Sequence, residues 1–290
     1  MLSRKILLRL LRNTSFIFIL SVFCGLAFPS SATVAEPFMT PALMVMMAFS
    51  LTEVHIGLKD GWSGSFSGLI LNYGILSGLI IALSSTITDE AVKSGFIVMA
   101  AVPPAISILP MTRLLKGDVR LSLYSEVLSY LAALLLMPGI IYLFAGKSGV
   151  DPLDLAEIAL LLILFPALVS RFIRFLPINP VFPINLGFFL VTYTVIGVNQ
   201  PIIWNDIGTV APIALARTFG IGIAIYIAAV LARKSASRRI SYTLLGSSKN
   251  LGLAAVVAMM LFGPEAGVPC AVSALAETAF FIFLAAAKPR

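Results

Sequence analysis

The stretch Leu244-Leu245-Gly246-Ser247-Ser248-Lys249-Asn250-Leu251-Gly252-Leu253-Ala254 places one ammonium, one amide and two hydroxyl groups within a long apolar run. A lysine at bilayer depth costs roughly 2.5–3.5 kcal/mol on insertion scales, so other groups of the protein have to meet it. Gly246 and Gly252 weaken a helix here, and the polar side chains can bond backbone groups that a break sets free. The stretch therefore predicts a broken membrane helix lining a cavity, with the break around Ser247–Asn250.

The composition indicates a polytopic all-α membrane protein. Of the 290 residues, 59% are hydrophobic and only 11% are charged, and apolar runs recur along the whole chain. No soluble domain of useful size fits between these runs, so a single transmembrane domain is expected. Cys24 and Cys270 both lie in apolar segments, which argues against a disulfide framework and a metal cluster. We expect no cofactor and no enzymatic activity.

Ten apolar runs approach the roughly 20 residues that cross the hydrocarbon core. They lie at Ser15–Phe28, Val34–Leu51, Gly64–Leu83, Ala91–Leu115, Leu121–Ala145, Leu155–Leu176, Pro183–Val198, Thr209–Ala232, Tyr242–Phe262 and Gly267–Ala286. The first run follows a basic segment, as in a signal peptide. No processed soluble domain follows it, so we expect a retained span.

The charges of the connecting loops alternate along the chain. Basic loop residues fall on the side of the N-terminus, namely Lys59, Lys116, Arg120, Arg171, Arg174, Arg233, Lys234, Arg238, Arg239, Lys288 and Arg290. The opposite loops hold acidic residues, with Lys93 and Lys147 as exceptions. The net charge of +7 is thus explained by orientation in a lipid bilayer rather than by nucleic-acid binding. We expect an integral protein of a bacterial inner membrane with both termini in the cytoplasm.

Two interrupted spans occupy matching positions in the two halves of the chain. The fourth span contains Pro103-Pro104, and the ninth contains Ser247–Asn250. Paired interruptions are typical of inverted-repeat transporters, in which half-helix ends meet near the midplane. The alternative is that the prolines only kink a packed helix. A kink alone does not predict a partner in the other half, so we expect two inverted repeats of five spans.

Several motifs are similar to those of the bile acid:sodium symporter superfamily. The matching residues are Gly117-Asp118 with Leu121-Ser122, and Asn250, Gly252, Leu253 and Ala254. Others resemble its arsenite-efflux branch more closely, namely Gly246-Ser247-Ser248, Leu261-Phe262-Gly263 and Glu277. The resemblance implies that the discontinuous helices four and nine cross. It also implies a core subdomain from spans at 64–145 and 209–287, beside a panel subdomain from spans at 15–52 and 155–198.

The chain departs from this family where the family binds sodium. A Glu and a Gln-Asn pair of the family's ninth span correspond here to Leu245, Lys249 and Asn250. The family's Ser-Asn pair in the fourth span aligns with Ile108 and Leu109. Most of the expected oxygen ligands are therefore missing, and we expect sodium to play no part.

Two further family positions also differ. A Thr ligand of the fifth span aligns with Glu126, and a Gln of the third span aligns with Asn72. The cysteine of the arsenite exporters is absent from Ala101–Ser107, which argues against arsenite as the substrate.

An acid and a base are left at the expected ion position. Glu126 lies six residues past Arg120, roughly 9 Å along a helix, and Lys249 lies ten past Arg239, roughly 15 Å. Because the resembling family places both positions around one ion, we predict that the Lys249 ammonium occupies the vacated cation site and pairs with Glu126. The alternative is a static buried pair without a transport role.

The remaining candidates carry less weight. Arg217 could hold an anionic substrate bidentately, or it could neutralise Glu277 inside the core, and both readings stay open. The other predicted substrate or coupling residues are Asn72, Pro103, Pro104, Ser107, Ser247, Ser248 and Asn250. His55, the only histidine, is expected to be a solvated residue near Glu53 at a span end.

These observations favour a secondary transporter of a small organic anion that is independent of sodium, and they leave coupling to protons open. A cation/proton antiporter is the alternative, with the acid and base forming the ion site, and an arsenite-type efflux permease is a further one. A membrane sensor or enzyme is less favoured, because the sequence has no zinc-binding HExxH motif and no appended cytosolic domain.

Overall fold

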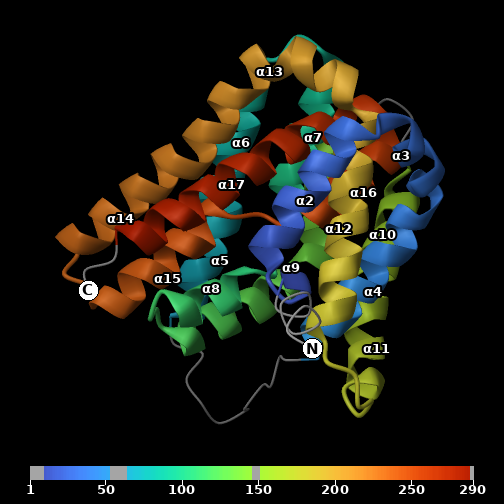
Figure 1. Cartoon of the computed structure of the whole chain (residues 1–290). Coiled ribbons are helices and arrows are strands. Elements are labelled where there is room, and N and C mark those ends of the chain that lie inside the picture. Colours follow the sequence, from blue (N-terminus) through green and yellow to red (C-terminus); the bar gives the residue numbers. More distant parts are fainter. Residues whose placement is uncertain (1–9, 53–63, 146–150, 288–290) are drawn as a thin grey trace.

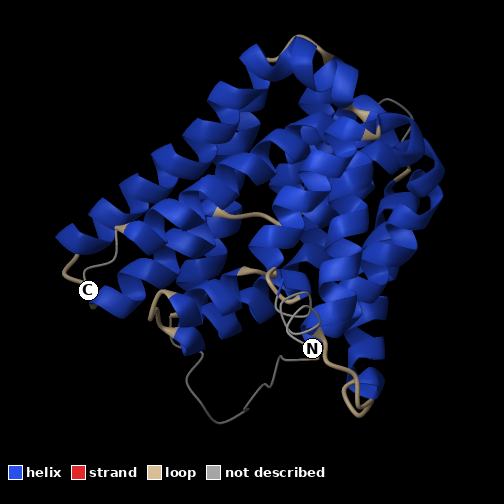
Figure 2. Cartoon of the chain, viewed as in Figure 1, coloured by secondary structure: helices blue, strands red, loops and turns tan. Residues whose placement is uncertain are grey.

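The computed structural model describes residues 10–52, 64–145 and 151–287, and the regular structure there is helical (Figures 1 and 2). Within these ranges, 8 helical segments are long and apolar enough to cross a membrane. They are Pro29–Leu51, Ser65–Ser84, Val119–Phe144, Pro152–Ile173, Val181–Val198, Ile207–Leu231, Ala236–Phe262 and Pro264–Ala286. The prediction of a polytopic helical membrane protein is confirmed, while the compartment and the orientation of the termini stay predictions.

The first and fourth expected spans are formed by shorter helices. Helix α2 (Thr14–Ala27) has 14 residues and helix α7 (Glu90–Ala101) has 12. At 1.5 Å per residue these helices reach about 21 and 18 Å, less than the roughly 30 Å of a hydrocarbon core. The total of ten spans therefore stays a prediction.

The first half of the fold continues from α2 through segments that follow one another closely. They are α3 (Pro29–Ala35), η1 (Glu36–Phe38), α4 (Met39–Leu51), α5 (Ser65–Leu69), the π-helical η2 (Ile70–Leu76), α6 (Ser77–Ser84), α7, α8 (Ile108–Leu114) and α9 (Val119–Phe144). Pro29 begins α3 one residue after α2 has ended, because proline suits a first helical turn.

The second half begins after the short gap in the description. Its elements are α10 (Pro152–Ala159), the π-helical η3 (Leu160–Leu164), α11 (Phe165–Ile173), α12 (Val181–Val198), α13 (Gln200–Leu215), the π-helical η4 (Ala216–Gly220), α14 (Ile221–Leu231), α15 (Ala236–Ser247), α16 (Leu251–Phe262), η5 (Pro264–Gly267) and α17 (Val268–Ala286). Helix α15 begins six residues before the predicted span at Tyr242, so Arg238 and Arg239 lie on a helix rather than in a loop.

Both predicted helix breaks are present. Helix α7 ends at Ala101, and Val102 is extended because the residue before a proline disfavours the helical region. Helix α15 ends at Ser247, and α16 restarts after Asn250, whose side-chain oxygen accepts from the backbone N of Leu253 at 3.1 Å.

The two breaks contact one another. The backbone N of Asn250 donates to the backbone O of Pro103 at 2.9 Å. The side chain of Tyr130 on α9 reinforces this contact, because its hydroxyl donates to Pro104 O at 3.3 Å and its oxygen accepts from Asn250 Nδ2 at 3.0 Å. The inverted repeat and the crossing of the two helices stay predictions.

Helix packing brings together helices that are far apart in the sequence. Helix α12 packs against α2, α3 and α4, and α4 also packs against α11 (Figure 1). Helix α7 packs against α6, α9, α16 and α17, so the first broken span lies among helices of both halves of the chain. The division into panel and core subdomains stays a prediction.

Gly95 lets α7 approach η5 closely. A Cβ atom added at Gly95 would lie 2.2 Å from the backbone O of Ala266, and backbone cannot give way as a flexible side chain can. We expect Gly95→Ala to destabilise the protein by about 1–3 kcal/mol, measured by thermal or denaturant unfolding in detergent. Gly139→Ala is the control, because a Cβ added there meets nothing within 4 Å. Equal stability of both variants would contradict this packing.

Candidate functional site

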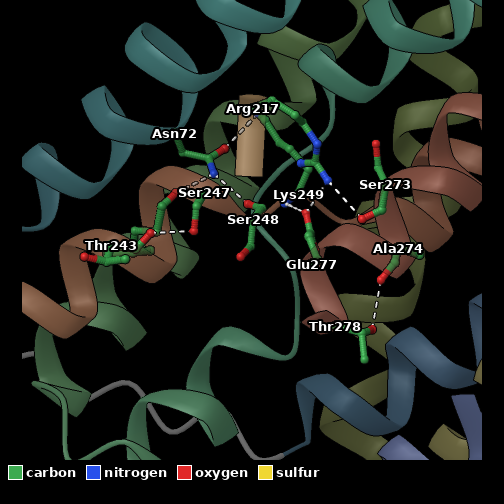
Figure 3. A network of polar contacts seen from close by, with 11 residues as sticks. Asn72, Arg217, Thr243, Ser247, Ser248, Lys249, Ser273, Ala274, Glu277 and Thr278 are labelled. Carbon is green, nitrogen blue, oxygen red and sulfur yellow. Dashed lines mark hydrogen bonds and ion pairs between the residues drawn. The ribbon is translucent and has the colours of Figure 1, made fainter. Parts of the chain in front are cut away.

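Lys249 lies in the break of the ninth span and is fully buried. Its Nζ donates to Asn72 Oδ1 at 2.8 Å, Ser77 Oγ at 2.9 Å, Val102 O at 2.9 Å and Ala100 O at 3.0 Å. Asn72, Lys249, Arg217 and Glu277 lie close together in Figure 3. The ammonium is thus surrounded by oxygens from the third and fourth spans.

The hydrogen bonds around Asn72 and Lys249 suit a protonated lysine. Asn72 Nδ2 donates to Leu245 O at 2.7 Å and Ser248 O at 3.0 Å, so its Oδ1 is turned toward Nζ. Three of the four oxygens around Nζ are carbonyl oxygens, which can only accept. An ammonium group has three N–H groups to offer them, whereas a neutral amine has two.

The break itself supplies two of these oxygens. Because α7 ends at Ala101, the backbone O atoms of its last turn have no partner further along the helix. The backbone O of Ala100, in this last turn, and the backbone O of Val102, just after the helix, accept from Lys249 Nζ instead. The Tyr73 ring lies 4.3 Å from Nζ and adds a cation–π contact on another side.

Asn72 and Ser77 reach the lysine together because η2 is π-helical. The i to i+5 spacing of a π-helix places residues five apart on the same side. Ser77 Oγ accordingly lies 3.1 Å from Asn72 O and donates to Ala100 O at 2.6 Å. Sequence reasoning missed Ser77 and Tyr73. The available signal was a polar residue five positions after Asn72 in a mainly apolar span.

The predicted Lys249–Glu126 ion pair is wrong. Lys249 Nζ bonds the four oxygens from spans three and four. An ammonium group has three N–H groups, so none is left for Glu126. Glu126 lies on α9, and its Oε1 is buried without a hydrogen-bond partner among the described residues. The acid and the base therefore belong to two different places in the fold.

The alternative in which Arg217 neutralises Glu277 matches the structure. Arg217 Nη2 lies 2.8 Å from Glu277 Oε1, and both side chains are buried. The same Oε1 accepts from the backbone N of Lys249 at 3.0 Å, so the pair also holds the break of the ninth span. Arg217 Nε and Nη1 have no partner among the residues that the structure describes. Arg217 lies in the π-helical η4, as Asn72 lies in η2.

The other predicted site residues mainly support the breaks. Ser247 Oγ donates to Thr243 O at 2.7 Å, whereas Ser248 Oγ is buried without a partner in the described part of the chain. Pro103, Pro104 and Asn250 form the contact between the breaks. Ser107 precedes α8, and its side chain does not cap the helix. The calls on Glu53, His55 and Lys59 fall outside the described residues.

A cavity of about 220 Å³ lies beside the first break. Residues of α4, η3 and α11 line one part of it, and residues of α8, α9 and the break line the rest. Glu126 and Tyr130 are among the lining side chains, whereas Lys249, Arg217 and Glu277 are not. The structure thus has a buried polar cluster at the ninth span and a separate, mainly apolar cavity at the fourth and fifth.

No family model matches this sequence, and a search of curated proteins finds no match either. Membership of the bile acid:sodium symporter superfamily is therefore not shown, and what the resemblance implies stays a prediction. The described residues also contain no group of three or more His, Cys, Asp or Glu side chains placed to bind a metal ion.

Proposed function

We propose that the protein is a secondary transporter of a small organic solute and that it works without sodium. The observation that carries this proposal is the set of four oxygens around Lys249 Nζ, at 2.8 to 3.0 Å. In transporters with broken helices, unwound backbone carbonyls and helix ends coordinate the coupling cation. Here an ammonium of the chain itself holds such oxygens, and it substitutes permanently for a diffusible ion.

The cavity beside the first break is the proposed solute site. Its volume of about 220 Å³ is below the ~300–1,000 Å³ of pockets for drug-sized ligands, which supports a small solute. It adjoins the contact between the two breaks, where movement of either half-helix would alter its walls. The organic anion stays a prediction, because Arg217, the buried guanidinium that could hold an anion, is paired with Glu277. The coupling to protons also stays a prediction.

Replacing sodium by potassium at constant ionic strength is expected to change neither thermal stability nor solute flux. The reason is that a covalently attached ammonium already occupies the oxygens that a cation would use. Thermal unfolding in detergent measures the stability. Efflux from vesicles loaded with organic acids and amines measures the solute flux. Empty vesicles are the control for leakage. A sodium-dependent gain in stability or flux of the unaltered protein would refute the proposal.

A cation/proton antiporter is the second candidate, and the unpartnered oxygen of Glu126 favours it. The acid–base pair first expected for that activity is not formed, but a single buried carboxylate can still exchange a proton for a cation. Dissipation of a pH gradient across vesicles on addition of metal cations would support this candidate. The arsenite-type efflux permease rests on the resemblance alone.

A further inference from the structure

The cavity beside the first break is lined by four described polar side chains, namely Ser50, Glu126, Tyr130 and Arg171. Ser50 Oγ donates to Met46 O at 2.8 Å. The hydroxyl of Tyr130 is occupied by Pro104 and Asn250, as described above. Glu126, in contrast, has a buried Oε1 atom without a hydrogen-bond partner in the described part of the chain. Glu126 therefore offers a solute a buried polar contact, whereas Arg171 is exposed to solvent.

The burial of Glu126 determines what that contact requires. The residue is only 7% exposed, and an ionised carboxylate can accept hydrogen bonds but cannot donate them. A carboxylate removed from water is stable only next to a positive or hydrogen-donating partner. The backbone N–H of Leu109 and the charge of Arg113 on α8 act on this carboxyl group, and Oε1 still has no hydrogen-bond partner in the described part of the chain. Arg113 and Arg171 are both exposed to solvent.

The other walls of the cavity are suited to an apolar group. They include Leu131 and Leu134 of α9, Ile163 and Leu164 of η3, and Leu109 of α8, the short helix after the break. Such walls gain free energy by covering hydrocarbon but offer no hydrogen bonds. A ligand that fits both features has a small apolar body and one positive, donating end.

We propose that this cavity binds a small organic cation, a primary amine with a short hydrocarbon tail, whose ammonium group bonds Glu126. The proposal rests on the cavity being the solute site of the proposed transporter, and it names the class of that solute. It departs from the organic anion predicted from the sequence. A carboxylate solute would be repelled by the Glu126 oxygen unless a proton is bound there, and would have to turn to the solvent-exposed Arg171 instead.

Three linear probes of six carbon atoms each separate the charge classes. Hexylamine, hexanol and hexanoate are titrated at neutral pH into the purified full-length protein in detergent, and calorimetry gives each affinity. We expect hexylamine, which is then protonated, to bind at least about 10-fold more tightly than hexanol, since charge-assisted hydrogen bonds are the strong ones. Hexanoate is expected to bind least.

Variants then assign the effect to the carboxylate. Glu126→Gln is expected to remove the preference for hexylamine while hexanol affinity stays within about 2-fold. Glu157→Gln, an exposed acid on α10 outside the cavity, is the matched control and is expected to change nothing. Ala167→Phe places a ring in the cavity and is expected to abolish binding of all three probes.

Each outcome decides for or against the proposal. Tighter binding of hexanoate, or equal binding of all three probes, would overturn it, as would a Glu126→Gln protein that keeps the preference for hexylamine. If Glu126→Gln does not fold, the order of the three affinities on the unaltered protein decides. Transport is judged separately in vesicles: hexylamine binding without hexylamine flux would refute the proposed function alone, and flux of hexanoate without hexylamine binding would refute this inference alone.

Discussion

Lys249→Ala is expected to give a protein that is markedly less stable in potassium and that recovers part of this stability in sodium. Removing the ammonium leaves Asn72 Oδ1, Ala100 O and Val102 O without their shared donor inside the membrane core. Removing one partner of a buried charged interaction costs about 3–5 kcal/mol, and each unsatisfied buried acceptor costs about 1–3 kcal/mol. The vacated space is lined by oxygens, which are the ligands that sodium prefers.

Thermal unfolding in detergent, with sodium titrated against potassium at constant ionic strength, measures this effect. Lys249→Met is the matched variant, because it fills the space with an apolar chain and should lose stability without a response to sodium. Lys93→Ala is the control for an exposed lysine, which pairs with Glu90 at 3.1 Å on the surface and should contribute about 0–1 kcal/mol. If Lys249→Ala keeps its stability and ignores sodium, Lys249 is a packing residue.

Arg217→Met and Glu277→Gln are each expected to lose about 3–5 kcal/mol, because each leaves an uncompensated buried group. The loss at Glu277 should be at least as large, since its Oε1 also accepts from the backbone N of Lys249 and so supports the break. The double variant Arg217→Met with Glu277→Met should lose less than the two single losses combined, because neither charge is then left alone.

Equilibrium unfolding of the single and double variants gives the coupling between the two side chains. Arg238→Ala is the surface control: its Nε lies 3.5 Å from Asp118 Oδ2 with the arginine side chain 47% exposed, and such pairs contribute about 0–1 kcal/mol. Additive losses at Arg217 and Glu277, or single losses no larger than that of Arg238→Ala, would contradict a buried ion pair at this position.

The helix breaks could be predicted because their causes are local. Proline lacks an N–H and restricts the residue before it, so Pro103-Pro104 favours a helix end at this point, and α7 ends at Ala101. Asn250 can cap α16 with its own side chain. Helix limits were harder to predict, since apolar composition marks the depth of the bilayer and not the end of a helix. Helix α15 therefore begins at Ala236, well before the apolar run.

The partners of Lys249 could not be predicted in the same way. Two of the four oxygens that accept from Lys249 Nζ are backbone atoms of Ala100 and Val102. Every residue has a backbone oxygen, so the residue types at these positions do not predict the contact. The other two depend on the π-helical turn that aligns Asn72 with Ser77, and the sequence has no established signal for such a turn. Sequence reasoning predicted that Lys249 and Glu126 are removed from water, and both side chains are buried. The direction in which each side chain points depends on helix rotation and packing, which the sequence does not specify.

The covalent attachment of the Lys249 ammonium has an electrical consequence. A cation that accompanies its solute crosses the membrane potential, which is worth about 2.3 kcal/mol per elementary charge per 100 mV. In the proposed transporter, the lysine charge would stay within the protein at the end of every cycle and would transfer no net current. For a transporter built in this way, the potential would act only on the charge of the solute and of any proton that moves with it. A neutral solute would then equilibrate without regard to voltage, whereas a monovalent cation would accumulate on the negative side.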